Sequence, residues 1–415
     1  MDLEIIGVQR SDCRVEQSRA YGGPARRDRG ARVGEGAAGL QHGCSQACSF
    51  SLAAHSFCPS HCALSTVAAQ SCKAEIARLA TQRGYGFWVS FNGALKHLTR
   101  QMYKLATCIP GTQRGRLGLV DVGAGLYAPP NLHGFEVIDG AIAVDDSDAL
   151  YLLAGFGGRA NVHAFEMNPA KAKELKRAVR LRPATQAYRH RLHVHTMGVG
   201  NTTKAARIAQ CGPANTWRVW DTTRAKYLGC KRGEQINETT LDAFALRERS
   251  LRGGIFYVKV DVEGGEWAVL EGMQSLLRNQ RVQLMSFEYG NGWHEAYGPK
   301  EPVPLALRPN IEHTLFNFQR RLLALGYDTY LLHGWRPPPR HSRGANARDI
   351  TLVPVYGDFW DDRFEICFDR KLFYRQYNAW CWNDLLIIRR GNTCLKHELL
   401  KIIHGHSLFP SCECL

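Results

Sequence analysis

Acidic residues and glycines follow one apolar segment in an arrangement that can do chemistry. Residues 257–266 read Tyr-Val-Lys-Val-Asp-Val-Glu-Gly-Gly-Glu, so an apolar strand ends on acids and passes into a helix at Glu266. Charged groups at the end of a buried strand are costly unless they contact a ligand or a partner. A carboxylate placed there can act as the general base that removes a proton from a hydroxyl. Asp261 is the first candidate for this base. Glu263 is the second, with a helix-dipole partner as its structural alternative.

A second group of residues predicts a nucleoside-containing ligand. Gly123 and Gly125 follow an apolar run and lack side chains, so a ligand can lie close against the backbone there. Glu166 ends the next apolar run, where its carboxylate can accept hydrogen bonds from a ribose diol. In open α/β sheets the carboxyl ends of the strands carry the ligand site. A glycine turn with a ribose-binding acid is common to dinucleotide enzymes and to S-adenosylmethionine enzymes, so this pattern alone leaves both open.

Two details favour S-adenosylmethionine. A pyrophosphate site needs a helix that opens directly on the glycine turn, whereas Pro129-Pro130 interrupts the chain here. The acid also lies 41 residues after Gly125 (166 minus 125), against about 20 in a dinucleotide fold. A sulfonium cofactor carries no phosphate and needs no such helix.

The elements that must position these residues alternate along the chain. Apolar runs predict strands at 117–122, 161–166, 192–199, 255–261 and 282–289. Helices are expected at 95–105, after Asn168-Pro169, from 266 to about 278, and at 315–325 before Gly326. This alternation predicts an α/β fold with a doubly wound, mostly parallel sheet and helices on both faces. Later strands at 328–332, 351–355 and 384–389 can extend the sheet.

The segment from about Leu117 to Gly290 resembles the FkbM-type methyltransferase family. The motifs that carry the resemblance are Val120–Gly125, His163–Pro169, Thr240–Asp242, Lys259–Glu266 and Ser286–Glu288. The resemblance implies a class I, Rossmann-like methyltransferase fold, S-adenosylmethionine as methyl donor, and usually a hydroxyl oxygen as acceptor.

Further site candidates lie in these motifs. Glu288, at the end of the fifth strand, is the third candidate base, with a structural hydrogen bond to a loop as its alternative. Asp121 and Asp242 join Gly123, Gly125 and Glu166 as cofactor-binding candidates, although Thr240-Leu241-Asp242 can instead simply cap the helix at 243–247. Lys259 lies two residues before Asp261, so both project from one face of the strand and can pair.

The predicted function is S-adenosylmethionine-dependent O-methylation of a hydroxyl on a small molecule, sugar or glycan. After the Asp-x-Gly-Ala start, the family usually has Asn-Ile-Gly, whereas this chain has Gly125-Leu126-Tyr127. Compared with the family pattern, this chain also has extra residues between the glycine turn and residues 146–148. A non-catalytic S-adenosylmethionine-binding module therefore stays open, as does an NAD-dependent oxidoreductase.

Composition limits the class of protein and the kinds of partner that the sequence allows. The chain has 415 residues, 45% of them hydrophobic and 22% charged, as in an ordinary globular protein. Its net charge of +15 is spread along the sequence, which favours a generally basic surface over a nucleic-acid site. The chain has no run of eighteen apolar residues, so no membrane-spanning helix is predicted. Cytoplasmic localisation is favoured, with organelle targeting by residues 1–73 as the alternative.

Four parts are expected along the chain. Residues 1–73 form a disordered or targeting segment, 74–116 a helical lead-in, 117–334 the methyltransferase core, and 335–415 a C-terminal extension with late strands and an aromatic-rich cover. The fourteen cysteines are expected to be reduced thiols, because a chain of this size needs no disulfides. No metal site is predicted.

Overall fold

The structure is a computed structural model that describes residues 103–108, 117–125, 136–138, 141–143, 147–211, 216–219, 231–262, 264–290, 313–334, 350–360, 364 and 382–403. The expectations for residues 1–73, for Glu263 and for most of the lead-in helix and the aromatic cover lie outside these residues. Of the lead-in, residues 103–105 are helical and the 3-10 helix η2 follows at Ala106–Cys108.

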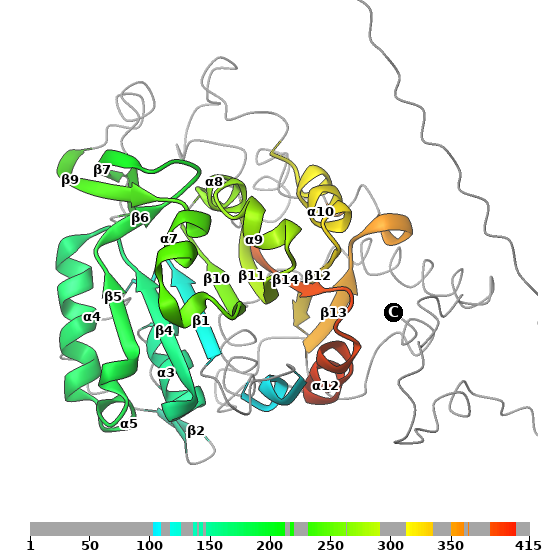
Figure 1. The fold of residues 1–415 in the computed structure, drawn as a ribbon, viewed down its shortest axis with the longest axis horizontal. Helices are drawn as coiled ribbons and strands as arrows, with labels where there is room; N and C mark the ends of the chain where they lie inside the picture. Colours follow the sequence, from blue (N-terminus) through cyan, green and yellow to red (C-terminus); the bar gives the residue numbers. More distant parts are fainter. Residues whose placement is uncertain are drawn as a thin grey trace, which may run out of the picture. The chain divides into compact units, whose positions relative to one another are not determined.

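The main sheet has eight strands in the order β13-β12-β14-β11-β10-β1-β4-β5 (Figure 1). Their bounds are β1 Leu117–Val122, β4 Ala160–Phe165, β5 Leu192–His195, β10 Ile255–Val260, β11 Val282–Gly290, β12 Tyr327–Gly334, β13 Ile350–Pro354 and β14 Trp382–Arg389. The five strands from β5 to β11 pair in parallel, while β14 is antiparallel to both β11 and β12. The expected mostly parallel sheet is confirmed.

Helices cover both faces of this sheet. The core on one face includes side chains of α3 (Asp148–Phe156), α4 (Pro169–Leu181) and α12 (Thr393–Ile403). The core on the other face includes side chains of α7 (Leu241–Arg247), α8 (Glu266–Glu271), α9 (Gln274–Arg278) and α10 (Leu315–Ala324). On β1 the side chains alternate between the two cores, with Leu119 in the core that includes α3 and Val120 in the core that includes α7. The doubly wound α/β class is thereby confirmed. Short elements are α5 Pro183–Gln186, η3 Gly157–Arg159, η4 Arg189–Arg191, η5 Arg249–Leu251 and η9 Gly357–Phe359.

Helix ends follow the signals in the sequence. The Asn168 side chain accepts hydrogen bonds from the amides of Ala170 and Lys171, and Pro169 is the first residue of α4. The Thr314 hydroxyl accepts the Asn317 amide at the start of α10. Gly326, which follows that helix, has a φ of 83° that favours glycine.

The predicted strand at 192–199 is wrong as a single element. It divides at Thr196 into β5, in the main sheet, and β6 (Met197–Val199), which pairs with β9 of a second sheet. That sheet has the order β6-β9-β7-β8, with β7 Lys204–Cys211, β8 Thr216–Val219 and β9 Lys231–Thr239. A separate pair joins β2 Glu136–Ile138 to β3 Ala141–Ala143. The strand-like pattern of residues 192–199 does not show that the chain leaves one sheet for another at Thr196.

The predicted helix from 266 to 278 also divides, into α8 and α9. Gly272 lies at the break, and a Cβ there would be 1.9 Å from the backbone oxygen of Gly200. The backbone oxygen of Gly272 accepts the Asp242 amide at 2.9 Å. The two helices are therefore separated where the chain packs tightly against neighbouring backbone.

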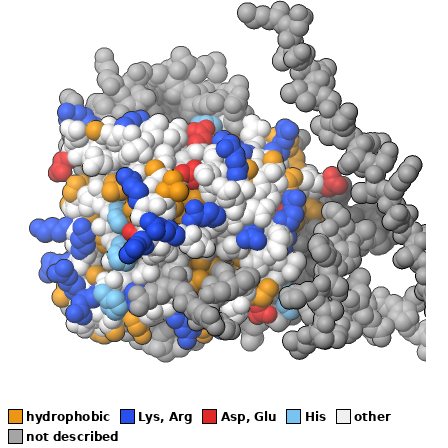
Figure 2. Space-filling model, in the orientation of Figure 1, with side chains coloured by type: hydrophobic (Ala, Val, Ile, Leu, Met, Phe, Trp, Pro, Cys, Tyr) orange, Lys and Arg blue, Asp and Glu red, His pale blue; other side chains and the backbone are white. Residues whose placement is uncertain are grey.

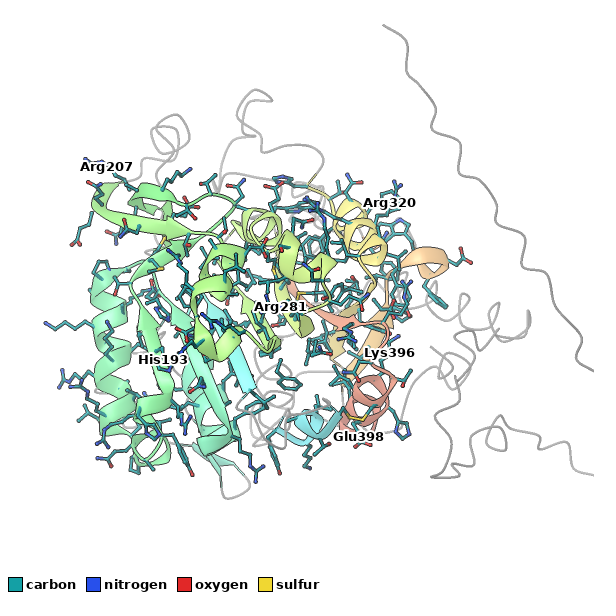
Figure 3. The ribbon with its side chains drawn as sticks, viewed as in Figure 1. His193, Arg207, Arg281, Arg320, Lys396 and Glu398 are labelled. Carbon is teal, nitrogen blue, oxygen red and sulfur yellow. A yellow bond between two sulfur atoms is a disulfide. The ribbon has the colours of Figure 1, made fainter. Side chains whose placement is uncertain are left out.

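The sheet continues past residue 334, as expected for late strands that extend it. Strand β14 lies in the sheet interior between β11 and β12, and β13 forms its edge. The C-terminal helix α12 is tied to the same body, because Lys396 forms an ion pair with Asp328 on β12. Figure 3 shows Lys396 at the opposite side of the molecule from His193 on β5.

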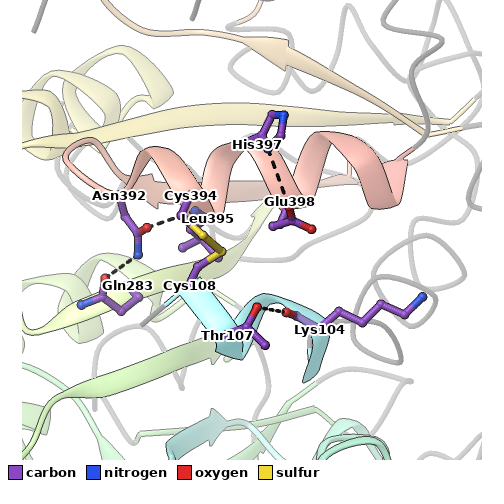
Figure 4. Close-up of a disulfide and its surroundings, with 9 residues drawn as sticks. All are labelled: Lys104, Thr107, Cys108, Gln283, Asn392, Cys394, Leu395, His397 and Glu398. Carbon is purple, nitrogen blue, oxygen red and sulfur yellow. Dashed lines mark hydrogen bonds and ion pairs between the residues drawn. A yellow bond between two sulfur atoms is a disulfide. The ribbon is translucent and has the colours of Figure 1, made fainter. Parts of the chain in front are cut away.

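A disulfide joins Cys108 in η2 to Cys394 in α12 (Figure 4). The expectation of reduced thiols is wrong for this pair, whose sequence separation of 286 residues gives no spacing signal. Close by, Asn392 donates to the Gln283 side chain on β11 at 3.1 Å and accepts the Leu395 amide at 3.0 Å. Helix α12 is thus fixed covalently to the start of the fold and by hydrogen bonds to the sheet.

The face of the molecule seen in Figure 2 carries many basic side chains. Figure 2 shows Lys and Arg scattered over this face among polar and apolar side chains rather than gathered in one patch. Among the described residues, none of the helices has the length and hydrophobicity to cross a membrane.

Candidate active site

The turn after β1 is held between the ends of its two neighbouring strands. The amides of Gly123 and Ala124 donate to the Phe165 oxygen at the end of β4, and the Asp261 amide donates to the Val122 oxygen. Gly123 has a φ of 86°, and a Cβ there would lie 1.7 Å from the Asp261 oxygen. Glycine is thus needed at 123 for the close approach of two chain segments, a reason that differs from the ligand contact expected from the sequence.

One lysine crosses from β10 toward carboxylates on three segments. The Lys259 ammonium lies 2.7 Å from Asp148 at the start of α3 and 3.0 Å from Asp261 just after β10. It also lies 3.9 Å from Asp121 on β1, its register partner. The expected pairing of Lys259 with Asp261 is confirmed, and Asp148 is added. We call Asp121, Asp148, Lys259 and Asp261 the lysine cluster.

The three acids of the lysine cluster differ in how far their side chains are buried. The Asp121 side chain is fully buried, whereas those of Asp148 and Asp261 are 14% and 17% exposed. Desolvation raises the pKa of Asp121 to about 7, and the Lys259 charge only partly counteracts it. Asp121 is therefore the enclosed member of the lysine cluster. Asp148 and Asp261 form the accessible rim.

The next strands add polar groups on the same face. Ser286 on β11 is the register partner of Lys259, and its hydroxyl lies 2.6 Å from that of Tyr257. Two residues farther along, Glu288 is the register partner of Asp384 on β14. Burial, followed by the charge of Asp261, raises the pKa of Asp384 to about 7. Glu288, predicted as a third base, thus lies one strand from β10 and beside this buried acid.

Glu166 and Gly125 meet at the end of β4. The carboxylate of Glu166 accepts the Asn168 amide at 2.7 Å through Oε1. Its Oε2 lies 3.4 Å from the place where a Cβ on Gly125 would be, with the Lys171 ammonium 3.7 Å from that place. Burial raises the pKa of Glu166, while the Asn168 amide and the Lys171 charge lower it. A backbone without a side chain beside a buried carboxylate fits a ligand hydroxyl pair.

Glu266 has a structural role in the turn that follows Asp261. Its Oε1 accepts the amides of Val262 and Gly264 at 3.0 and 3.1 Å. Burial raises the pKa of Glu266 to about 7, and these two amides counteract part of the shift. The turn that positions the Asp261 carboxylate is therefore closed by the first residue of α8. Glu263 lies between them, outside the described residues.

Asp242 lies apart from the lysine cluster. Both of its carboxylate oxygens accept amides of α9, from Ser275 at 2.7 Å and Leu276 at 2.8 Å. The expected cap at Thr240-Leu241-Asp242 is present, because the Thr240 hydroxyl accepts the Ala243 amide at the start of α7. These bonds join α7 to α9, and the cofactor role expected for Asp242 stays a prediction.

Asp148 and Asp384 were not among the residues singled out from the sequence. Asp148 stands in the first turn of the helix after the glycine turn, which is a weak local signal. Asp384 shares a strand face with Leu386 and Ile388, whose side chains are buried in the α3-side core. Neither local pattern indicates a charged cluster, because the cluster forms only when strands that are distant in the sequence pair in the sheet.

The site's chemistry fits a cationic nucleoside cofactor. A buried carboxylate beside Gly125 can bind ribose hydroxyls, and a carboxylate-rich group one strand away can face a positive charge. Among the described residues, no three or more His, Cys, Asp or Glu side chains are arranged to hold a metal ion. Lys259 supplies the positive charge at the centre of the lysine cluster.

The chain matches one protein family over part of its length. The model of the methyltransferase FkbM domain matches residues 128–328. This range includes Glu166, Asp242, Asp261 and Glu288, and it begins just after Gly125. No curated protein matches the chain significantly.

Three solved structures are distant structural relatives. Methyltransferase FkbM from Methylobacillus flagellatus KT is 15% identical with a TM-score of 0.31, over 58% of this chain and 48% of that one. Cofactor-bound Rv0187 from MTB is 12% identical with a TM-score of 0.30, over 78% and 89%. An O-methyltransferase from Bacillus cereus in complex with SAH is 8% identical with a TM-score of 0.29, over 77% and 90%. The chain thus spans about half of the Methylobacillus protein, and the functional argument rests on the family match.

Proposed function

Residues 128–328 belong to the FkbM methyltransferase domain family, and from that premise we propose that the chain is an S-adenosylmethionine-dependent methyltransferase that acts on a hydroxyl group. The acceptor class is a small molecule, a sugar or a glycan. The observation that carries the proposal is the Asp261 carboxylate, held at the carboxyl end of β10 by the Lys259 ammonium at 3.0 Å.

The proposed roles follow from position. Glu166 accepts hydrogen bonds from the ribose hydroxyls of the cofactor, next to the open backbone of Gly125. When bound, the cofactor supplies an electrophilic methyl group. Asp261 accepts the proton that the acceptor hydroxyl loses as its oxygen forms the new bond to carbon. Glu263 and Glu288 are the second and third candidates for this proton transfer.

Lys259 has two effects on this base. Its hydrogen bond to Asp261 fixes the orientation of the carboxylate, and its positive charge lies beside the group that is to accept the proton. The closed turn at Val262 and Gly264 limits movement of the same residue. A fixed base lowers the entropic cost of reaching the reactive geometry.

Calorimetric titration of the full chain tests the cofactor. We expect S-adenosylmethionine to bind and NAD to give no binding heat. Binding of NAD alone would reject the methyltransferase proposal in favour of an oxidoreductase. Binding of S-adenosylmethionine without methyl transfer, across a broad panel of hydroxylated acceptors, would instead favour the non-catalytic module.

A further inference from the structure

We propose that Lys171 is a second residue that recognises the nucleoside, and that one ribose hydroxyl binds between its ammonium group and the Glu166 carboxylate. This inference rests on the proposed function and adds a binding residue to the same site. The sequence motif indicated Glu166 alone, whereas Lys171 lies in the first turn of α4.

The first observation concerns the two oxygens of the Glu166 carboxylate. The residue is buried, with 6% of its surface exposed. Its Oε1 accepts the Asn168 amide at 2.7 Å, whereas no described residue donates a hydrogen bond to Oε2. That second oxygen lies 3.4 Å from the place where a Cβ on Gly125 would be. A buried polar atom without a hydrogen bond costs free energy, so a ligand that donates to Oε2 would bind favourably.

The second observation is that the Lys171 ammonium lies beside the same place. Its Nζ is 3.7 Å from the position of a Cβ on Gly125. Burial raises the pKa of Glu166, while the Asn168 amide and the Lys171 charge lower it, so the two charged groups already act on each other. Within the part of the chain that the structure describes, however, they form no ion pair. Each can therefore bind a third group that lies beside Gly125.

A hydroxyl group is the ligand that matches this pair of charges. Its hydrogen can be donated to the Glu166 carboxylate while its oxygen accepts a hydrogen bond from the Lys171 ammonium. A cationic group would be repelled by the lysine, and an anionic group would be repelled by the glutamate. Hydrogen bonds in which one partner is charged are also stronger than neutral ones. The pair thus favours a neutral hydroxyl, as a ribose provides.

Gly125 leaves the space in which this hydroxyl would lie. Its φ is not in the left-handed region, and an added Cβ would be at an ordinary contact distance of 3.4 Å from Oε2 of Glu166. Gly123 differs, because its φ is 86° and a Cβ there would lie 1.7 Å from the Asp261 oxygen. Alanine should therefore be tolerated by the fold at position 125, where it would occupy the space of the ligand hydroxyl.

Calorimetric titration of the full chain with S-adenosylhomocysteine tests the inference, since this ligand has the ribose but no methyl group to transfer. Lys171→Met removes the ammonium and keeps most of the side-chain length. We expect the affinity to fall by about tenfold or more, as for the loss of a hydrogen bond to a charged group. Lys171→Arg keeps a cationic donor and should recover part of the loss. Lys173→Met, at an exposed position of α4, is the matched control and should bind as the wild type does.

Modified ligands separate a contact with the ribose from a general effect on the site. The probes are the 2′-deoxy and 3′-deoxy analogues of S-adenosylhomocysteine, each of which lacks one ribose hydroxyl. With the analogue that lacks the bridging hydroxyl, we expect Lys171→Met and the wild type to bind equally well. A loss of equal size for the parent ligand and for both analogues overturns the inference, because the lysine then acts elsewhere.

Gly125→Ala tests the location of the bound hydroxyl independently. We expect weaker binding of S-adenosylhomocysteine, with a thermal unfolding midpoint close to that of the wild type. Wild-type affinity in Lys171→Met or in Gly125→Ala overturns the inference and leaves the proposed function intact. Failure of the wild type to bind both S-adenosylmethionine and S-adenosylhomocysteine overturns the proposed function, and the inference with it.

Discussion

The Lys259 ammonium and the turn closed by Glu266 both help to position the Asp261 carboxylate. Asp261→Asn keeps the shape of the side chain and an oxygen for Lys259, but it removes most of the basicity. We expect methyl transfer to fall by roughly 10²–10⁴-fold, the usual scale for a general base, with cofactor affinity retained. Transfer of labelled methyl groups to acceptors measures the rate. An unchanged rate would move the role of base to Glu263 or Glu288.

Glu166 is predicted to contribute to cofactor affinity rather than to turnover. Glu166→Gln keeps an oxygen that can accept the Asn168 amide, while it removes the charge that binds ribose hydroxyls. We expect S-adenosylmethionine binding to weaken by about 1.5–3 kcal/mol, the range for hydrogen bonds to charged groups. Glu174→Gln, on the exposed side of α4, is the matched control and should bind normally. Equal affinity in the two variants would make Glu166 a structural residue.

Individual site residues differ in how well the sequence predicts them. Asp261 and Glu166 can be found because each acid directly follows an apolar run and precedes a helix signal. Asp384 cannot, since its place depends on β14 pairing with β11 across nearly one hundred residues of chain. Asp242 has the same local pattern whether it binds a cofactor or caps a helix, and its contacts with α9 cannot be predicted from that pattern.

At the scale of elements, Gly272 separates α8 from α9 because its backbone touches that of Gly200. In Gly272→Ala the new Cβ would lie 1.9 Å from the Gly200 oxygen, so one chain segment must move. We expect the free energy of unfolding to fall by about 1–3 kcal/mol, as for other overpacked sites. Urea denaturation followed by circular dichroism measures the change.

The matched control for this prediction is Gly253→Ala. No atom lies within 4 Å of the Cβ that it would add. Its stability should therefore stay within about 0.5 kcal/mol of the wild type, as for surface substitutions. Equal stability of the two variants would show that the contact between Gly272 and Gly200 is not tight in solution.

The elements themselves were predictable to different extents. Strands β1, β4, β10 and β11 stand out as apolar runs between helix signals, and the late strands were found as well. The small sheet was missed, because the strand residues of β7 and β9 are rich in charged and small side chains. The break at Thr196 was missed because the spacing of apolar residues indicates a strand but does not indicate which strand pairs with it.

At the scale of the whole molecule, the disulfide between Cys108 and Cys394 joins the start of the described fold to its last helix. Replacing both cysteines by serine should lower the free energy of unfolding by about 2–5 kcal/mol, because the unfolded chain regains freedom. Thermal unfolding with and without reductant measures this. The wild type should lose stability in reductant and the double variant should not. Identical melting of the wild type under both conditions would contradict the prediction.

The same bond bears on localisation. Disulfides persist mainly in oxidising compartments, and the cytoplasmic localisation favoured by the sequence stays a prediction. Fractionation of cells that express the full chain, with thiol alkylation before lysis, measures the compartment and the redox state together.

The disulfide also turns most of the chain into a covalent ring with two tails. All eight strands of the main sheet lie between Cys108 and Cys394, and therefore within the ring. A protease that cuts one loop inside the ring opens it but releases no fragment, whereas a cut in either tail frees a peptide. A nicked molecule would thus migrate as one species until a thiol is added, and β14 would stay attached to the strands on both of its sides.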